Sequence, residues 1–340
     1  MNDIPRSRIA FVALCGLALA AYPLGAGAFG LDLTTKIMVY AIFALSLELL
    51  VGATGLVCFG HAAFFGIGAY AALLLSPGND AASLGWLLPA SIGAAALFAL
   101  MMGALSLRTQ GVYFIMVTLA FAQMAYYVVH DTPLGGGTDG IYLSAKPVLA
   151  IAGATLIDLD KALPIYYFTL GCLVAVFGFL ALLLRSRFGR ALAGIKTNEQ
   201  RMRATGFSTY PYKLAAFVIS GAIAGLAGFL FGVKDGYVNP ELMSWHLSGS
   251  VLIMIILGGL GHLRGALIGA FAFALLQEFF KSELIFGGFA KHWALGLGLT
   301  IIASVALLPR GLVGLPAQWR ERWVGRPTRV GEGARQEAAR

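Results

Sequence analysis

The chain has 340 residues, of which 59% are hydrophobic and only 12% are charged, and its formal net charge is +8. The charged share is about half of the roughly 25% that ordinary soluble domains carry. This composition excludes a disordered chain, a disulfide framework and a soluble nucleic-acid-binding protein as descriptions of the whole chain. It predicts an all-α polytopic membrane protein.

The three cysteines, Cys15, Cys58 and Cys172, lie inside apolar runs. None of them has the spacing of a metal ligand or a C-x-x-C motif, so they are typical of small buried hydrophobic residues. We therefore expect neither a metal ion nor a cofactor.

Apolar segments that can cross a bilayer follow one another over residues 9–310. A helix needs about 20 apolar residues to span the hydrocarbon core, and about ten segments approach this length, some of them short or broken by glycine. In chain order, the expected spans are Ile9–Phe29, Thr35–Ala53, Cys58–Leu75, Leu84–Leu107, Gly111–Val129, Pro164–Leu184, Tyr212–Val233, Leu247–Leu260, Gly265–Phe280 and Leu284–Leu308.

Three of these segments allow more than one interpretation. Leu247–Leu260 and Gly265–Phe280 are short and meet at a glycine-rich turn, so they form either a tight hairpin of two spans or a re-entrant pair. Ile9–Phe29 follows Arg6 and Arg8 as a signal peptide would. Its apolar core is too long for a signal peptide and further spans follow, so we interpret it as a retained first helix.

The distribution of Lys and Arg predicts the orientation in the membrane, because cytoplasmic loops carry more of these residues. With both termini inside, only six of the 24 Lys and Arg residues face outward. Residues 1–8 then form a cytoplasmic N-terminus and residues 311–340 a basic cytoplasmic tail. We expect this tail to lie on anionic membrane lipid or to be disordered, without a nucleic-acid partner. The six outward residues are Lys36, Lys146, Lys161, Lys234, Lys281 and Lys291.

Two loops between the spans are long enough to have a function of their own. Residues 131–163 form an external loop, and residues 185–211 form a cytoplasmic loop. The sequence contains no P-loop, HExxH or GxSxG motif. We therefore expect a transport subunit without catalytic residues and without an ATPase site.

Residues 52–69 are rich in glycine and include the junction between the expected spans Thr35–Ala53 and Cys58–Leu75. Each glycine weakens a helix by roughly 1 kcal/mol, and broken helices at membrane depth often line a substrate path. The stretch is either a loop between half-spans that lines a translocation path or a tightly packed helix turn. Its candidate path residues are Gly60, Gly66 and Gly68.

Ionisable residues inside membrane spans are costly and therefore informative. Glu48 is expected either to bind a substrate ammonium or a partner helix, or to be a protonated or paired interior acid. His61 stands beside a glycine near a span boundary and is either a hydrogen-bonded packing residue or a ligand-binding residue.

The cytoplasmic loop contains a short sequence with helix start and stop signals. Thr197 or Asn198 can cap a helix that Gly206 ends, and Pro211 then opens the next span at a position that a helix tolerates. On the cytoplasmic face of a transporter without its own energy source, such a helix is a natural docking element for a separate motor. The alternative is a basic loop that rests on lipid headgroups.

Motifs that extend from residue 35 to residue 310 occur in the order of one transporter family. They are Leu45–Tyr70, Gly111–Phe114 with Thr118–Phe121, Gly135–Gly140, Asn198–Gly206, Tyr212–Phe217, Gly236–Glu241 and Leu257–Gly261. Together they resemble the LivM-type permeases, which are membrane subunits of the ABC importers for branched-chain amino acids and related compounds.

The resemblance implies inward transport of such amino acids across a bacterial inner membrane. It also implies a pore shared with a LivH-type partner permease, two ATP-binding cassette ATPase subunits, and a periplasmic amino-acid-binding protein. The residues implied for ATPase coupling are Glu199, Arg203, Ala204 and Gly206. Those implied for the translocation path or substrate are Glu48, Gly60, His61, Gly66, Gly68, Tyr113 and Thr118. Those implied for the external loop are Gly136, Gly137 and Asp139.

Some residues depart from the family pattern. Cys58 stands where the family usually has serine, and Glu48 where an amide is common, so the substrate could be basic or amine-bearing. Further departures are His262, Arg264 and Ala266.

Other functions stay open on sequence grounds. The first is a permease of the same architecture for urea, short amides or other small solutes. The second is a secondary transporter that protons drive through Glu48 and His61. The third, an intramembrane enzyme that uses His61 with Glu48 or Asp139, is disfavoured because no further residue completes a recognisable site.

Overall fold

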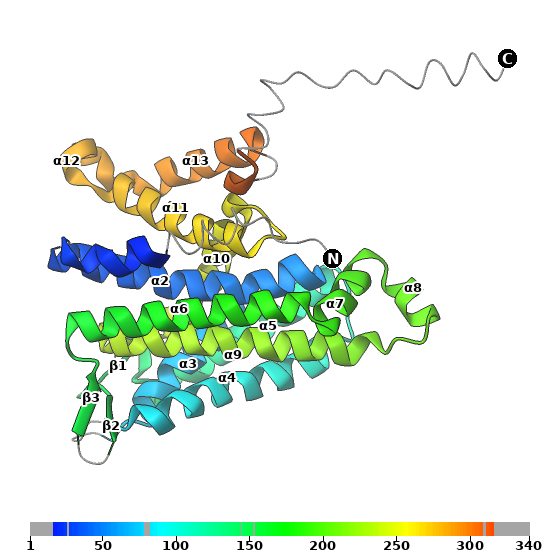
Figure 1. Ribbon diagram of the computed structural model, residues 1–340, viewed down its shortest axis with the longest axis horizontal. Coiled ribbons are helices and arrows are strands. Elements are labelled where there is room, and N and C mark those ends of the chain that lie inside the picture. The colour runs from blue at the N-terminus through cyan, green and yellow to red at the C-terminus, as the bar shows by residue number, and fades with distance from the viewer. Residues whose placement is uncertain are drawn as a thin grey trace.

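Long apolar helices make up most of the computed structural model, which describes residues 16–25, 27–77, 82–143, 145–151, 154–308 and 311–315 (Figure 1). The expected N-terminus, residues 1–8, and most of the expected basic tail lie outside these residues. The long helices are α2 Ala28–Glu48, α4 Leu84–Ser106, α5 Val112–Asp131, α6 Ala162–Arg185, α9 Thr209–Asp235 and α11 Leu263–Lys281. The shorter ones are α3 His61–Leu74, α7 Arg187–Thr197, α8 Glu199–Ala204, α10 Trp245–Gly258, α12 Glu283–Phe286 and α13 Trp293–Leu307.

The number of helices agrees with an all-α polytopic protein, although about ten full spans is an approximation. In the described part of the chain, seven helices are long and apolar enough to cross a membrane. Helices α3 and α10 are apolar but have 14 residues each. At 1.5 Å per residue, such a helix is about 21 Å long, which is less than the roughly 30 Å hydrocarbon core.

The boundary between the first two expected spans differs from the structure. Phe29 belongs to α2, which begins at Ala28, well before the expected Thr35. The polar residues Asp32 and Lys36 interrupt the hydropathy pattern and suggested a break there. In the structure α2 continues through them, and Asp32 forms an ion pair with Lys234 of α9 at 2.7 Å.

Helices α2, α3 and α9 form the centre of the bundle, with α4 and α6 against them and α10, α11 and α13 on one side (Figure 1). The helices come close because small residues occupy the crossings, as is typical of membrane helix packing. A Cβ at Gly228 of α9 would overlap the carbonyl oxygen of Phe65 in α3, and a Cβ at Gly68 would overlap the backbone of Gly225. Glycine at these positions lets backbone pack directly on backbone.

The glycine-rich stretch after α2 breaks the helix, as expected. Helix α2 continues into one wider, π-helical segment, η2 Leu49–Thr54, which ends where Gly55 has a φ of +76°. The backbone is then irregular until α3 begins at His61. A break of this kind costs backbone hydrogen bonds in a membrane unless other groups satisfy them.

The eighth and ninth apolar segments form a hairpin. Helices α10 and α11 pack against each other through glycines: a Cβ at Gly258 would overlap the Gly265 carbonyl oxygen, and one at Gly269 would overlap that of Met254. The turn between them contains Gly259 and Gly261, both with positive φ. Such a contact is common to both expected arrangements, the hairpin of two spans and the re-entrant pair. Of the two helices, α11 is long enough to span the membrane, whereas α10 is a shorter apolar helix.

The loop of residues 131–163, which the sequence predicts to be external, contains short strands that the sequence did not predict. Strand β1 Ile141–Tyr142 pairs antiparallel with β4 Tyr237–Val238, and β2 Val148–Ile151 pairs with β3 Ala154–Asp158. The β2–β3 hairpin projects from the end of the bundle opposite α7 and α8 (Figure 1). The first pairing joins two motifs that are about a hundred residues apart in the chain and was invisible to local patterns, because a two-residue strand has no periodicity.

Candidate functional site

Helix α8 is a short, capped helix on the segment that connects α6 to α9. The side chain of Asn198 caps it by accepting a hydrogen bond from the Arg201 amide at 2.9 Å. Its last turn is closed by Gly206, whose φ of +86° favours glycine and whose amide donates to the Arg203 carbonyl. The predicted start and stop signals are confirmed, with Asn198 rather than Thr197 as the cap.

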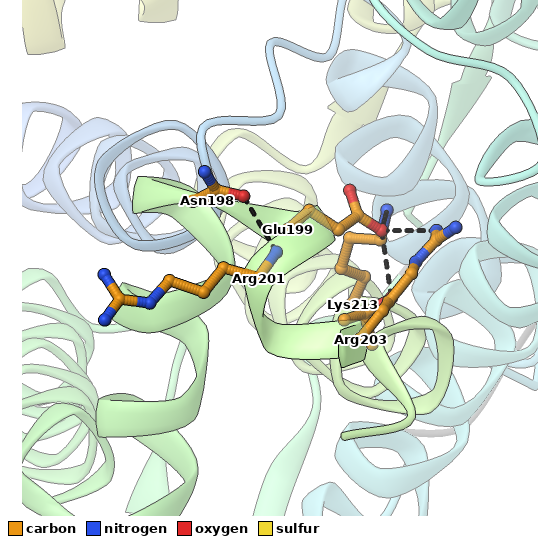
Figure 2. A network of polar contacts seen from close by, with 6 residues as sticks. Asn198, Glu199, Arg201, Arg203 and Lys213 are labelled. Carbon is orange, nitrogen blue, oxygen red and sulfur yellow. Dashed lines mark hydrogen bonds and ion pairs between the residues drawn. The ribbon is translucent and has the colours of Figure 1, made fainter. Parts of the chain in front are cut away.

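The carboxylate of Glu199 gathers the polar groups around α8 (Figure 2). Its Oε1 accepts hydrogen bonds from Arg203 at 2.6 Å, from Lys213 at 2.8 Å and from Thr209 at 2.9 Å. Lys213 and Thr209 belong to the first turns of α9, so one carboxylate fastens α8 to a membrane-spanning helix. The side chain of Arg201 points away from this group (Figure 2).

The charges in this cluster are partly removed from water. The Lys213 side chain is only 6% exposed, and that of Glu199 is 26% exposed. Burial opposes ionisation of Glu199, but the hydrogen bonds from Lys213, Thr209 and Arg203 outweigh it and hold the pKa of this carboxyl below its usual value. Glu199 therefore stays ionised at neutral pH, and the nearly buried ammonium of Lys213 keeps its counter-charge.

The outer surface of α8 is open to a partner. Gln200, Arg201, Ala204 and Gly206 are exposed. The preceding helix α7 is amphipathic: Ala191, Leu192 and Ile195 are buried, while its basic residues face out. The exposed basic residues of α7 are Arg187, Arg190 and Lys196. A rigidly held helix with an exposed face can bind a second protein without ordering cost.

Lys196 of α7 connects this segment to the glycine-rich break. Its Nζ donates to the carbonyl oxygen of Gly52, in η2, at 2.8 Å, and its stem lies against Gly55. The bond satisfies one backbone carbonyl at the point where the helix is interrupted. It also brings α7 into direct contact with η2, which follows the end of α2.

His61 is fully buried at the start of α3. Its Nε2 shares a hydrogen bond of 2.7 Å with the Oγ of Ser46, and its ring stacks on Phe43 with centroids 5.4 Å apart. The carbonyl of Ser46 in turn accepts a hydrogen bond from Ser220 of α9. These contacts join α2, α3 and α9, and Glu48 is not part of them.

The candidate path glycines lie at helix contacts. Gly60 packs against the Thr118 carbonyl of α5 and the Met102 side chain of α4, and Gly66 packs against Met243. Thr118 is buried and its Oγ1 donates to the Ile115 carbonyl within its own helix. The structure thus brings Gly60 and Thr118 together where the start of α3 meets α5, and Gly68 lies against α9. His61 follows Gly60 in the chain, but its ring faces Ser46 and Phe43 of α2.

Glu48 is the last residue of α2, and its carboxylate is hydrogen-bonded to a backbone amide. Its Oε1 accepts a hydrogen bond of 2.7 Å from the amide of Gly261, in the turn between α10 and α11. A Cβ at Gly52 would overlap the same carboxylate, so glycine there makes room for it. Of the roles expected for Glu48, this contact favours pairing with another helical element.

Tyr113 lies apart from the other path candidates, on the outside of α5. It is 73% exposed and belongs to a stripe with Met116, Met124 and Tyr127 at helical spacing. An open groove on the same helix is lined by Ala120, Gln123, Met124, Tyr127 and Val128. This stripe carries tyrosine and methionine beside Gln123, whereas the exposed residues of α13 are aliphatic.

In the loop of residues 131–163, Gly136 and Gly137 have positive φ and form tight turns around Asp139. The carbonyl of Asp139 accepts a hydrogen bond of 3.0 Å from the Tyr237 hydroxyl, and its side chain is exposed to solvent. The three candidates of this loop therefore lie together, next to the β1–β4 pair.

Several contacts that organise the site were missed from the sequence. Lys213, Thr209 and Ser46 were not singled out, and Lys196 was counted only as part of a basic loop. A lysine inside the first turns of an apolar helix is a signal, because a buried ammonium needs a counter-charge. Among the described residues, no three His, Cys, Asp or Glu side chains lie close enough together to hold a metal ion.

Comparison with known proteins agrees with this architecture. A family model described as the permease component of branched-chain amino acid transport systems matches residues 30–305. The chain is 30% identical to the high-affinity branched-chain amino acid transport system permease protein LivM of Escherichia coli over 329 residues, which cover 91% of this chain and 75% of LivM. It is 26% identical to BraD of Pseudomonas aeruginosa over 82% of this chain and 92% of BraD.

The chain is also similar to the high-affinity branched-chain amino acid transport system permease protein LivH of Escherichia coli. It is 23% identical over 294 residues, which cover 82% of this chain and 92% of LivH. No solved structure matches the chain. The match to the family model covers more than half of the sequence and includes every helix from α2 to α11. This chain therefore belongs to the family of permease components of branched-chain amino acid transport systems.

Proposed function

We propose that this protein is the membrane subunit of an ABC importer that carries branched-chain or related amino acids inward, driven by separate ATPase subunits that dock on α8. The family membership supports the substrate class, and the lack of any ATPase motif in the sequence supports a separate motor. The subunit itself has no catalytic role in this proposal. The main support for docking on α8 is the cluster that Glu199 forms with Arg203, Thr209 and Lys213, called the Glu199 cluster below. It holds α8 firmly while the outer surface of this helix stays exposed.

The docking residues of this proposal are Glu199, Arg203, Ala204 and Gly206. Glu199 and Arg203 hold α8 in position, and Ala204 and Gly206 offer a small, exposed surface against which a partner can pack closely. Because α8 is fixed to α9, a movement of the ATPases would be transmitted directly to a membrane-spanning helix.

Leucine transport by the assembled complex tests this function. The chain is produced with its neighbouring permease and ATPase genes, reconstituted in liposomes, and supplied with binding protein and radiolabelled leucine. We expect uptake to require ATP and to persist after the proton gradient is dissipated. Uptake that the proton gradient alone drives, or active uptake by the purified chain without partners, would instead support a secondary transporter through Glu48 and His61. Urea and acetamide in the same assay test the small-amide alternative.

For the translocation path, we propose the surface formed by the exposed stripe of α5 and the adjoining α3–α5 contact. Tyr113 belongs to the stripe, Gly60 and Thr118 belong to the contact, and His61 is the residue after Gly60 at the start of α3. Gly66 and Gly68 would act by keeping α3 close to its neighbours. A LivH-type permease, similar to this chain along most of its length, would present a corresponding face, and the path would lie between the two subunits.

On the outside, we propose that Gly136, Gly137 and Asp139 form part of the surface that receives a periplasmic amino-acid-binding protein. The β1–β4 pair supports the rigid presentation of this loop. The protein would lie in a bacterial inner membrane with both termini in the cytoplasm, since that orientation places most Lys and Arg residues inside.

Cysteine labelling tests the orientation. In a variant without native cysteines, Thr138→Cys is expected to react with a membrane-impermeant maleimide in intact spheroplasts, because this exposed residue belongs to the external loop. Gln200→Cys is its matched control on α8 and is expected to react only after permeabilisation. The reverse pattern would overturn the proposed orientation.

A further inference from the structure

The turn between α10 and α11 is anchored to α2 by a single side chain. The Glu48 carboxylate accepts the Gly261 amide at 2.7 Å, across 213 residues of sequence. The turn also packs against the backbone at Gly311, but Glu48 is the residue that connects it to the end of α2. A carboxylate is well suited to this place, since it lies just before the N-terminus of α11, where the helix dipole favours negative charge.

The same region is anchored to the docking segment by Lys196. Its ammonium binds the Gly52 carbonyl, and Gly52 is the residue whose missing side chain accommodates the Glu48 carboxylate. The ammonium of Lys196 also acts on this carboxylate electrostatically. Two polar contacts therefore run in series from α7 through the end of α2 to the α10–α11 turn.

The elements at each end of this series are rigid. Helix α8 is held by the Glu199 cluster, and α7 packs on α8 where Gly194 meets Met202. The α10–α11 hairpin is held by backbone contacts at Gly258 and Gly269. The connection between them passes through the end of α2 and η2, next to the irregular segment that leads to α3, where the interrupted helix can bend. Rigid bodies joined at a flexible point move together only if direct contacts fasten them.

We propose that Glu48 is a positioning residue that makes the α10–α11 hairpin move with the α7–α8 docking segment. The inference rests on the proposed function, because the docking segment is where the ATPases would act. Glu48 transmits motion in this scheme and does not touch the transported solute. Gly52 and Lys196 are the other two members of the connection.

Variants of Glu48 test the connection through the ratio of leucine uptake to ATP hydrolysis in the reconstituted complex. Glu48→Ala is expected to lower this ratio at least about tenfold, the factor associated with loss of one hydrogen bond to a charged group. Glu48→Gln keeps an oxygen that accepts the Gly261 amide and is expected to retain most of the coupling. Gly52→Ala is expected to resemble Glu48→Ala, because the added methyl group displaces the carboxylate.

The matched control is Tyr166→Phe, which removes a partly buried hydrogen bond of 2.6 Å to the Leu19 carbonyl. This bond also joins two distant segments, but it lies outside the connection. We expect normal coupling in this variant even if its thermal stability falls. Normal coupling in Glu48→Ala, or an equal loss in Glu48→Gln and Glu48→Ala, would overturn the proposal.

A double-mutant cycle with Lys196→Met tests whether the two contacts act in series. Either break alone interrupts a serial connection, so the double variant should be no worse than the more severe single variant. Two independent contributions would add instead. Additive losses would therefore contradict the proposal.

A distance measurement between α7 and the α10–α11 turn tests the connection independently of leucine transport. Spin labels at Thr197→Cys in α7 and Leu260→Cys in the turn, both exposed, are introduced into a variant without native cysteines. The distance should stay narrow and unchanged between the nucleotide-free and the ATP–vanadate complex, and should broaden when Glu48→Ala is added. A distance that changes between the two states of the otherwise unmodified complex, or that ignores Glu48→Ala, would overturn the proposal. A narrow, Glu48-dependent distance in a complex that fails to transport leucine would support it while overturning the proposed function.

Discussion

Glu199→Arg is expected to abolish transport-coupled ATP hydrolysis while the protein still inserts into the membrane. The variant places a third cation beside Arg203 and Lys213. The Lys213 ammonium loses its counter-charge and is too buried for water to solvate it instead. Removing one partner of a largely buried pair is far more costly than losing an exposed one. Helix α8 should then detach from α9, and the ATPases should lose their fixed contact.

The size of the effect follows from the affinity of docking. A loss of 1.4 kcal/mol already lowers binding tenfold, so we expect stimulated hydrolysis in the reconstituted complex to fall by more than about tenfold. Glu199→Gln, which keeps an acceptor for Thr209 but loses the charge, should give a smaller loss. The measurement is ATP hydrolysis with and without binding protein and leucine, and co-purification of the ATPases with the permease.

Asp160→Arg is a matched control for this charge reversal. Asp160 also pairs with a lysine, Lys146 at 3.6 Å, but in the external loop at the opposite end of the bundle. Its exposed ion pair contributes little, so hydrolysis should stay normal. Unchanged stimulated hydrolysis in Glu199→Arg would remove the assignment of α8 as the docking element.

Gly228→Ala is expected to be strongly destabilising, because it adds a methyl group where the backbones of α3 and α9 touch. Its Cβ would overlap the Phe65 carbonyl oxygen and come within 3.0 Å of the Ala69 amide nitrogen. Neither atom belongs to a flexible side chain, so α3 and α9 would have to separate along their contact. Overpacking typically costs about 1–3 kcal/mol, and a clash between two backbones should exceed this range.

Thermal unfolding of the purified protein in detergent checks this expectation, together with the yield of monodisperse protein. Gly171→Ala is the matched control, since nothing lies within 4 Å of a Cβ built at that position in α6. This variant should be at least as stable as the unmodified protein, because alanine favours a helix over glycine. Equal unfolding temperatures for the two variants would show that the α3–α9 contact tolerates separation.

The α8 segment was predictable because its signals are local. The cap, the helix and the terminating glycine lie within Asn198–Gly206, and each acts through hydrogen bonds to nearby backbone. The partners of Glu199 were not predictable in the same way. Thr209 and Lys213 follow it by about three helical turns of sequence, across a bend, so only the path of the chain brings them to the carboxylate.

For the glycines, too, the sequence predicted some features and the tertiary structure decided others. Their abundance predicted close helix packing and a broken helix, and both are present in the structure. Sequence alone did not separate the glycines that end a helix, such as Gly55, from those that permit a crossing, such as Gly68. That distinction depends on which backbone lies opposite, and residues opposite each other across two helices share no periodic relation.

By itself, the sequence determined the class of this protein, the number of its apolar helices to within a few, and the position of its short capped helix. These properties follow from hydrophobicity and from interactions within one or two helical turns. Only the tertiary structure decided the partner of Glu48, the anchoring of Gly52 by Lys196 and the pairing of β1 with β4. Each of these contacts joins residues nearly a hundred or more positions apart, so it exists only after the bundle has formed.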